Sequence, residues 1–286
     1  MTQHDATMST VLLTAVAMIA FAANSVLCRM ALAPAAIDPA SFTSLRLVSG
    51  AVTLWFLSRL TSGGRKIRGG SWEGAAYLFL YAITFSFAYT SLSAGTGALL
   101  LFGSVQIAMI AWALVVGERP GPGRWIGMVV ALVGFVYLVL PGLTAPSPAG
   151  AALMTTAGIA WAFYSLRRRG RGDPLPETAG NFARAAPMAL AVSLVLAGRA
   201  HASPAGMALA VMSGALASGL GYVVWYAALR GLTASGAAVS QISVAPIAAL
   251  GGIVFLGETL NSRIIVSSVL ILGGIALALL SRSRPR

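Results

Sequence analysis

Charged residues are scarce in this chain of 286 residues. Asp, Glu, Lys and Arg make up 9% of it and hydrophobic residues 58%, whereas a soluble domain carries about 25% charged residues. A soluble globular fold is therefore excluded. Apolar runs recur along the whole chain, and roughly 20 apolar residues cross a hydrocarbon core about 30 Å thick. The composition therefore predicts a protein with several membrane-spanning segments.

Cysteine and histidine are also nearly absent. The chain has one cysteine, Cys28, and two histidines, His4 and His201, so it lacks the residues for an intrachain disulfide or a zinc site. We expect no metal and no cofactor. The sequence has no HExxH motif, no pair of intramembrane Asp residues and no Ser/His pair within its apolar runs. We therefore expect that the protein is not an enzyme.

The long apolar–polar alternation that a transmembrane β-barrel requires is missing too. Residues 129–140 and 266–280 are instead nearly continuous apolar stretches. A backbone inside lipid must satisfy its own hydrogen bonds, so these stretches are expected to be helices. The first apolar run, 11–23, follows a leader without Lys or Arg, and we expect it to be retained as a helix rather than removed as a signal peptide.

Clusters of Gly, Pro and charge divide the chain into ten apolar spans. An uncharged linker, PGLTAPSPAG at 141–150, separates two halves, 1–142 and 143–286, each with five spans. The sequence therefore predicts an all-α polytopic membrane protein. The expected spans are 9–31, 39–60, 73–93, 96–116, 123–141, 149–167, 180–198, 206–229, 233–256 and 263–281.

Positive charge is distributed unequally between the two sides of the expected bundle. Fourteen of the nineteen Lys and Arg residues fall on the side that holds both termini, and only Arg29, Arg199 and Arg263 fall on the other. Short loops rich in Lys and Arg remain cytoplasmic, so both termini are expected in the cytoplasm. This topology explains the net charge of +12. Because the charge is spread over short loops, we expect contact with membrane lipid and no nucleic-acid partner.

The two halves resemble each other at an offset close to 140 residues. The segment IAFAANS at 19–25 matches IAWAFYS at 159–165, and Gly117-Glu118 matches Gly257-Glu258. Because five is odd, the second copy must enter the membrane in the opposite orientation. Inverted repeats support two alternative arrangements around a binding site near the bilayer midplane. This organisation favours a small-molecule transporter that works by alternating access.

These features resemble a known family over essentially the whole chain. Ten spans as five plus five, Gly-Glu at the ends of spans 4 and 9, and the motif shared by spans 1 and 6 resemble the drug/metabolite transporter superfamily, EamA type. The aromatic residues of the expected interior are most similar to the YddG-like exporters of aromatic amino acids and methyl viologen. The resemblance implies a central cavity between spans 1–4 and 6–9, spans 5 and 10 as packing or homodimer helices, and export across a bacterial inner membrane.

Polar and aromatic residues near the middle of the spans are candidates for this cavity, because an unpaired polar group in hydrocarbon is costly. Phe21 and Asn24 in span 1 have Trp161 and Tyr164 as their repeat mates in span 6. A second interpretation remains open for each candidate, as an interhelical hydrogen bond or as plain aromatic packing. The candidates are Phe21, Asn24, Tyr81, Phe85, Gln106, Trp161, Tyr164, Tyr222, Trp225 and Gln241.

Charges and a proline inside the spans give further candidates. Arg46, several residues into span 2, either meets a substrate carboxylate or snorkels to the surface, and Arg184 in span 7 is expected to snorkel. Pro246 is either a hinge or a tolerated kink in span 9. No Asp or Glu falls in a span core, so we expect facilitated export down a gradient or weak coupling rather than proton exchange at a buried carboxylate. Glu258 is expected to cap or clamp a loop near Arg263.

The sequence thus predicts a transporter that exports amino acids, aromatic ones included, and related small metabolites. Efflux of flat organic cations such as methyl viologen, held by cation–π contacts with Trp and Tyr, remains an alternative. The lack of a carboxylate in the span cores counts modestly against it. A membrane scaffold or receptor that moves no solute is the remaining alternative, and it gives no reason for inverted repeats.

Overall fold

A computed structural model describes residues 3–61, 69–117, 121–142, 145–167, 174–232, 237 and 240–280. Within these ranges the chain is helical, and its β-structure is limited to a single bridge between Ile37 and Ala202. The first half contains α1 (Gln3–Leu32), α2 (Pro39–Thr61), α3 (Trp72–Ala88), α4 (Ala94–Val115) and α5 (Pro122–Val139). The second half contains α6 (Pro148–Arg167), α7 (Pro174–Val195), the 3-10 turn η1 (Ala197–Arg199), α8 (Pro204–Met212), the π-helix η2 (Ser213–Leu220), α9 (Gly221–Leu229), α11 (Val244–Leu256) and α12 (Ser262–Leu280).

The stretch Pro204–Leu229 is continuous through α8, η2 and α9, so the described residues form ten crossing segments. Six of the described helices are long and apolar enough to cross a membrane, and Trp125–Val139 and Ser240–Leu256 are shorter apolar helices. The prediction of an all-α polytopic membrane protein is confirmed.

Several helix ends differ from the expected spans by five or six residues, at the start of spans 1 and 7 and at the end of span 3. Span 7 was placed at 180–198, but α7 already begins at Pro174. Proline is tolerated in the first turn of a helix, where its missing N–H has no partner to lose. Span 3 was expected to reach residue 93, but α3 ends at Ala88 and Tyr89 caps it.

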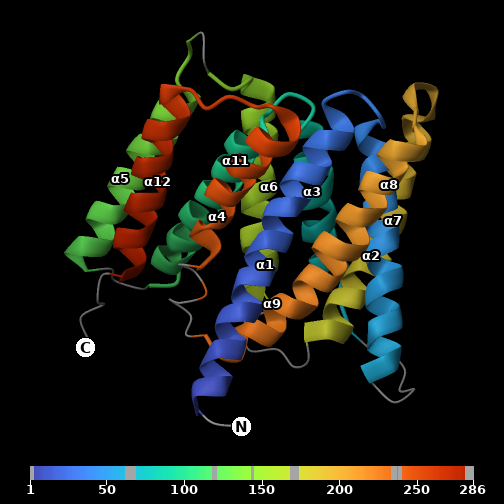
Figure 1. The fold of residues 1–286 in the computed structure, drawn as a ribbon, viewed down its shortest axis with the longest axis horizontal. Coiled ribbons are helices and arrows are strands. Elements are labelled where there is room, and N and C mark those ends of the chain that lie inside the picture. The colour runs from blue at the N-terminus through green and yellow to red at the C-terminus, as the bar shows by residue number, and fades with distance from the viewer. Residues whose placement is uncertain are drawn as a thin grey trace.

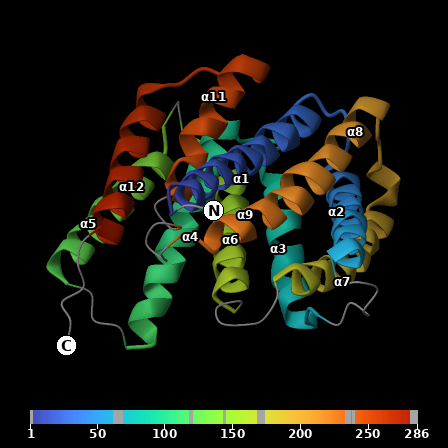
Figure 2. The ribbon, with the colours of Figure 1, turned by 60° about the horizontal axis from the view of Figure 1, so that its bottom comes forward.

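The first helix of each half packs into the other half. Helix α1 contacts η2, α9 and α11 of the second half, and α6 contacts α3 and α4 of the first half. Helices α2 and α7 pack against each other at the opposite side of the bundle from α5 and α12 (Figures 1 and 2). The pair α5 and α12 lies at one side of the bundle in both views (Figures 1 and 2). The exchange of α1 and α6 interlocks the two halves and leaves their shared seam at the centre.

The helix ends form two opposite faces. The Arg29 face, at the top of Figure 1, holds the end of α1, the α3–α4 turn and the connection between α11 and α12. The opposite Arg59 face holds the start of α1 and the end of α2. On the Arg29 face, residues 36–38 bond to residues 201–203, which links the two halves there.

Asp38 strengthens this link at the start of α2. Its carboxylate accepts hydrogen bonds from the N–H groups of Ala40, Ser41 and His201 at 2.9–3.1 Å. Partial burial raises the pKa of Asp38, but the hydrogen bonds from Ser41, His201 and Ala40 outweigh it, and the pKa lies below its ordinary value. The stabilisation by ionised Asp38 is therefore present above about pH 4 and is lost as the pH falls through the lowered pKa.

Small residues allow α5 and α12 to touch backbone to backbone. A Cβ atom on Gly127 would lie 2.5 Å from the Gly274 carbonyl oxygen, and one on Gly274 would lie 2.5 Å from the Ala131 nitrogen. Glycine pairs of this kind hold membrane helices together through close packing. Gly273, the neighbour of Gly274, has no atom within 4 Å of its corresponding position.

The adjacent glycines of α12 give a matched test of this packing. We expect Gly274→Ala to push α12 away from α5 and to lower the melting temperature in detergent, because overpacking costs about 1–3 kcal/mol. Gly273→Ala is the control and should leave the melting temperature unchanged. Equal melting temperatures for the two variants would show that this contact does not set the helix spacing.

Candidate functional site

A small cavity lies at the centre of the bundle, where the two halves meet. Its volume is about 30 Å³, room for one or two water molecules. The bundle is therefore closed around the cavity in this conformation and must widen to admit a solute. The lining residues are Phe21, Asn24, Ser25, Tyr81, Phe85, Leu101, Phe102, Trp161, Ala217, Ser218, Tyr222 and Gln241.

Aromatic rings from both halves form the walls of the cavity. The ring of Trp161 stacks on Tyr222 with a centroid distance of 5.4 Å and an interplanar angle of 19°, and it lies 4.9 Å from the ring of Tyr81. Phe21 meets Tyr222 edge-on at 5.8 Å. Phe21 and Trp161, which are repeat mates, thus approach the cavity from opposite halves, in the geometries that aromatic pairs prefer.

A chain of polar groups runs beside these rings. The Ser213 hydroxyl donates to Asn24 Oδ1 at 2.6 Å, and Asn24 Nδ2 donates to the Tyr81 hydroxyl at a longer 3.5 Å. Arg46 Nη2 donates to the same Tyr81 oxygen at 3.0 Å, and Arg46 Nε donates to Ser218 Oγ at 3.4 Å. Tyr81 therefore joins the amide of α1 to the guanidinium of α2 at the cavity wall.

Arg46 does not snorkel to the surface. Only 2% of the residue is exposed, and its guanidinium lies over the rings of Tyr81 and Phe85 at 5.2 and 5.0 Å. Its Nη1 atom has no hydrogen-bond partner among the described residues. Arg184, which is half-buried, donates through Nη1 to the carbonyls of Gly69, just before α3, and Gly180 at 2.9 Å.

Two interruptions of regular helix border the cavity, both in the second half. The π-helix η2 supplies Ala217 and Ser218 to the lining, and π-turns within helices frequently mark functional sites. Gly214 lets η2 rest directly on the α2 backbone at Arg46. The ninth segment breaks at Ser243, two residues after Gln241 of the lining.

Pro246 explains the position of this second break. Its ring clashes with the carbonyl group four residues earlier, at Ile242, and removes one backbone hydrogen bond. The Ser243 side chain instead donates to the carbonyl of Ser240 at 2.7 Å. Non-helical backbone at membrane depth is tolerated where it is buried in protein or lines a cavity.

The structure brings together most of the residues that the sequence singled out. Seven of them line the cavity: Phe21, Asn24, Tyr81, Phe85, Trp161, Tyr222 and Gln241. Three lie directly behind the wall. Arg46 contacts Tyr81, Tyr164 lies 5.4 Å from the Trp161 ring, and Trp225 lies 5.9 Å from the Phe21 ring.

Gln106 is placed elsewhere. It lines a separate hollow between α4, α5 and α12, because its side of α4 faces away from the centre. Sequence reasoning missed Ser25, Leu101, Phe102, Ala217 and Ser218. Ser25 belongs to the repeated segment 19–25, which was the available signal. Small or apolar residues such as Ala217 give no such signal.

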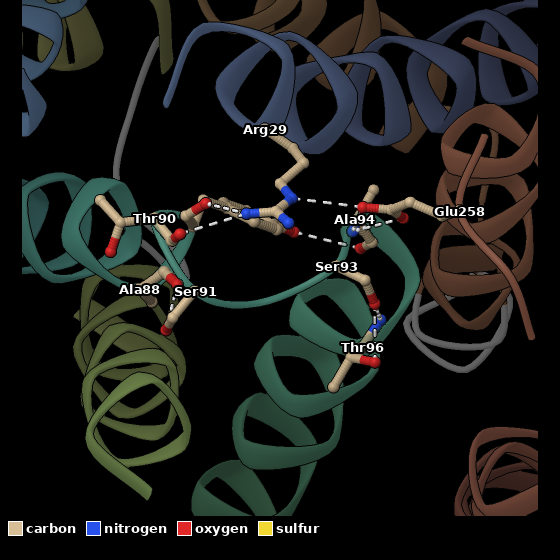
Figure 3. Close-up of polar contacts among 9 residues, drawn as sticks. Arg29, Ala88, Thr90, Ser91, Ser93, Ala94, Thr96 and Glu258 are labelled. Carbon is tan, nitrogen blue, oxygen red and sulfur yellow. Dashed lines mark hydrogen bonds and ion pairs between the residues drawn. The ribbon is translucent and has the colours of Figure 1, made fainter. Parts of the chain in front are cut away.

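A second polar cluster closes the Arg29 face (Figure 3). Arg29, in the last turn of α1, contacts the Glu258 carboxylate at 3.3 Å and donates to the carbonyls of Tyr89 and Thr90. Both oxygens of Glu258 accept from the N–H of Ala94, the first residue of α4, at 3.1 and 2.9 Å. Four segments, α1, α3, α4 and α11, are therefore joined at one point. Glu258 thus acts as a clamp, and its partners are Arg29 and the start of α4.

The Gly-Glu dipeptide has a physical explanation here. Gly257 has a φ of +65° and ends α11, while the N–H of Glu258 bonds to the carbonyl of Gly252 at 3.1 Å. Glycine adopts this left-handed conformation readily and reverses the chain at a helix end. The turn directs Glu258 back across α11 toward α4. Gly117, its repeat counterpart, has a φ of +89°, and Glu118 lies outside the described residues.

Comparison with known proteins agrees with this arrangement. A protein of Pseudomonas aeruginosa named as uncharacterized protein PA1977 is 51% identical over 273 residues, which cover 96% of this chain and 95% of that protein. A protein of known crystal structure superposes with a TM-score of 0.66 over 92% of this chain and 95% of its own, and its 19% identity shows likeness of fold alone. The profile of the EamA-like transporter family matches residues 8–140 and again 148–280. Both halves thus carry the family pattern around the central cavity, and the chain belongs to the EamA-like transporter family.

Proposed function

We propose that this membrane transporter exports amino acids, aromatic ones included, and related small metabolites from the cytoplasm. The observation that carries the proposal is the composition of the cavity. Aromatic rings form its walls, Asn24, Ser25, Ser218 and Gln241 add amide and hydroxyl groups, and none of the lining residues is acidic. An apolar pocket with a few convergent polar groups is typical of small-molecule sites. The similarity to YddG-like exporters supports the same substrates.

The charge beside the cavity weighs against organic cations as principal substrates. Aromatic rings alone attract a flat cation such as methyl viologen. Arg46, however, lies directly behind Tyr81 and Phe85 and already occupies their faces with a positive charge. A second cation in the cavity meets repulsion and finds no lining carboxylate. A zwitterionic amino acid instead offers a carboxylate to the basic side.

Alternating access is the mechanism that we propose for this export. The positive-inside rule places the Arg29 face toward the periplasm and both termini in the cytoplasm. In this conformation Arg29 and Glu258 fasten the first half to the second at that face. Side chains of both are largely buried, with 21% and 15% exposed, so the ion pair is only partly screened. Export requires this contact to open, and we propose that it is the periplasmic gate.

Substrate flux is the direct test of the proposed function. The purified protein in liposomes is expected to move radiolabelled Phe, Trp and Thr down their gradients, with or without an imposed pH gradient, because no lining residue is acidic. Methyl viologen flux is measured in parallel. Movement of methyl viologen without any amino-acid flux would transfer the proposal to cation efflux.

The placement of the cavity makes a separate prediction. We expect Trp161→Ala to reduce amino-acid flux about tenfold or more at normal protein levels, because it removes the ring that contacts Tyr81 and Tyr222 and such stacking contributes about 0.5–1.5 kcal/mol per pair. Gln106→Leu, which alters the separate hollow, should leave flux close to wild type. The opposite pattern would place the site against α5 and α12.

The proposed gate is tested with the chain's own cysteine. Cys28 is fully buried next to Arg29, so a membrane-impermeant maleimide should label it only when the Arg29 face opens. Glu258→Gln removes the ion pair and the charge at the start of α4. We expect labelling from the periplasmic side to become about 5- to 30-fold faster, the effect of losing one or two kcal/mol from the closed state.

A second ion pair supplies the control for this measurement. Glu73 pairs with Arg167 at the Arg59 face, and Glu73→Gln removes the same kind of interaction from the other side of the bundle. Cys28 labelling from the periplasm should not change in this variant. If both substitutions accelerate labelling equally, the effect is general loosening and the Arg29–Glu258 pair is not a gate.

A further inference from the structure

The guanidinium of Arg46 is buried, and one of its nitrogen atoms lacks a hydrogen-bond partner among the described residues. Arginine has five N–H donors. Nε and Nη2 have partners in Ser218 and Tyr81, but Nη1 is buried without one among the described residues. Unsatisfied donors on a buried charge are strongly unfavourable, so such groups usually have a functional explanation.

Among the described residues, no Asp or Glu forms an ion pair with Arg46. All seven Asp and Glu residues lie outside the cores of the spans by sequence. In the described part, the ion pairs are Arg29–Glu258 and Arg167–Glu73, both at helix ends. In place of a carboxylate, the guanidinium of Arg46 contacts the ring faces of Tyr81 and Phe85.

Comparison with Arg184 separates this arrangement from an ordinary structural arginine. Arg184 also lies within a span, but its Nη1 donates to two backbone carbonyls and fixes the chain at Gly69 to α7. Arg46 makes no backbone contact of this kind among its described hydrogen bonds. Its partners are instead two hydroxyl groups, those of Tyr81 and Ser218.

These partners place Arg46 at the cavity. Tyr81, Phe85 and Ser218 all contact the guanidinium, and all three line the cavity. The rings of Tyr81 and Phe85 and the hydroxyl groups of Tyr81 and Ser218 lie between the guanidinium and the cavity. When the cavity widens, Nη1 and Nη2 become available together to the two oxygens of a carboxylate, the bidentate geometry that arginine favours.

We infer that Arg46 is the carboxylate-recognition residue of the cavity and that the transporter selects solutes by their carboxylate group. This deepens the proposed function and rests on it. Aromatic amino acids and simple aromatic acids are bound, and the corresponding amines are excluded. The aromatic walls recognise the remainder of the solute, so the ring and the carboxylate are recognised by different parts of the site.

Three analogues of one size test this inference. Uptake of radiolabelled L-Phe into proteoliposomes is measured against 3-phenylpropionate, which lacks the amine, and against 2-phenylethylamine, which lacks the carboxylate. The acid should compete about 10- to 100-fold more strongly than the amine, the range expected for hydrogen bonds to a charged group. Equal competition by acid and amine would refute carboxylate selection while leaving amino-acid export intact.

Substitutions assign the selection to Arg46. Arg46→Met should abolish the difference between acid and amine, and Arg46→Lys should restore part of it, because lysine keeps the charge without the fork geometry. Arg184→Met is the matched control, and its acid-to-amine ratio should equal that of the wild type. A wild-type ratio in Arg46→Met would overturn the assignment.

Thermal stabilisation separates this inference from the proposed function. Removing an uncompensated buried charge does not by itself destabilise a protein, and an apolar residue of similar volume is often neutral or stabilising. Arg46→Met is thus expected to fold. In detergent, 3-phenylpropionate should raise the melting temperature of the wild type and not of Arg46→Met. If this stabilisation is seen but L-Phe flux is absent, the carboxylate site is retained and amino-acid export is rejected. If 3-phenylpropionate does not raise the melting temperature of the wild type, the site itself is rejected.

Discussion

The structure depends on one constraint, that a backbone in hydrocarbon must satisfy its own hydrogen bonds. Ten helical segments meet it along almost all of the described chain. Two exceptions, the π-helix η2 and the break at Ser243, border the central cavity, and Pro187 inside α7 removes one further backbone donor. Irregular backbone is tolerated at membrane depth where protein surrounds it or a cavity adjoins it. Two of these irregular segments therefore coincide with the site, and both belong to the second half.

The exchange of α1 and α6 between the halves links the cavity to the closed face. Helix α1 supplies Phe21 and Asn24 to the cavity and Arg29 to the cluster at its own end. Two turns of one rigid helix thus separate the centre from the contact with Glu258. A change in the cavity that tilts α1 must also act on that contact, since a helix of this length transmits its motion to both ends.

The sequence predicted the helices well, because long apolar runs leave the backbone no alternative in lipid. The offset of 140 residues identified Phe21 and Trp161, which both line the cavity and both contact Tyr222. It did not fix the rotation of α4, so Gln106 was assigned to the wrong hollow. The π-helix was not predictable, since SGALASGL reads as an ordinary apolar helix of small residues. The partner of Glu258 depends on the left-handed turn at Gly257 and on the packing of α1, which no local pattern specifies.

Arg29 and Arg46, the two arginines near α3, differ in their hydrogen-bond partners. Arg29 is bonded to a carboxylate and two carbonyls and so stabilises the closed face, whereas Arg46 retains an unbonded Nη1 beside the cavity. A ligand shifts a conformational equilibrium only by its differential affinity for the two states. A bound carboxylate supplies Arg46 with the partner that the closed cavity of about 30 Å³ has no room to admit. In the proposed mechanism, the unsatisfied charge therefore favours the wider conformation when a carboxylate substrate is present, and substrate binding drives the opening of the bundle.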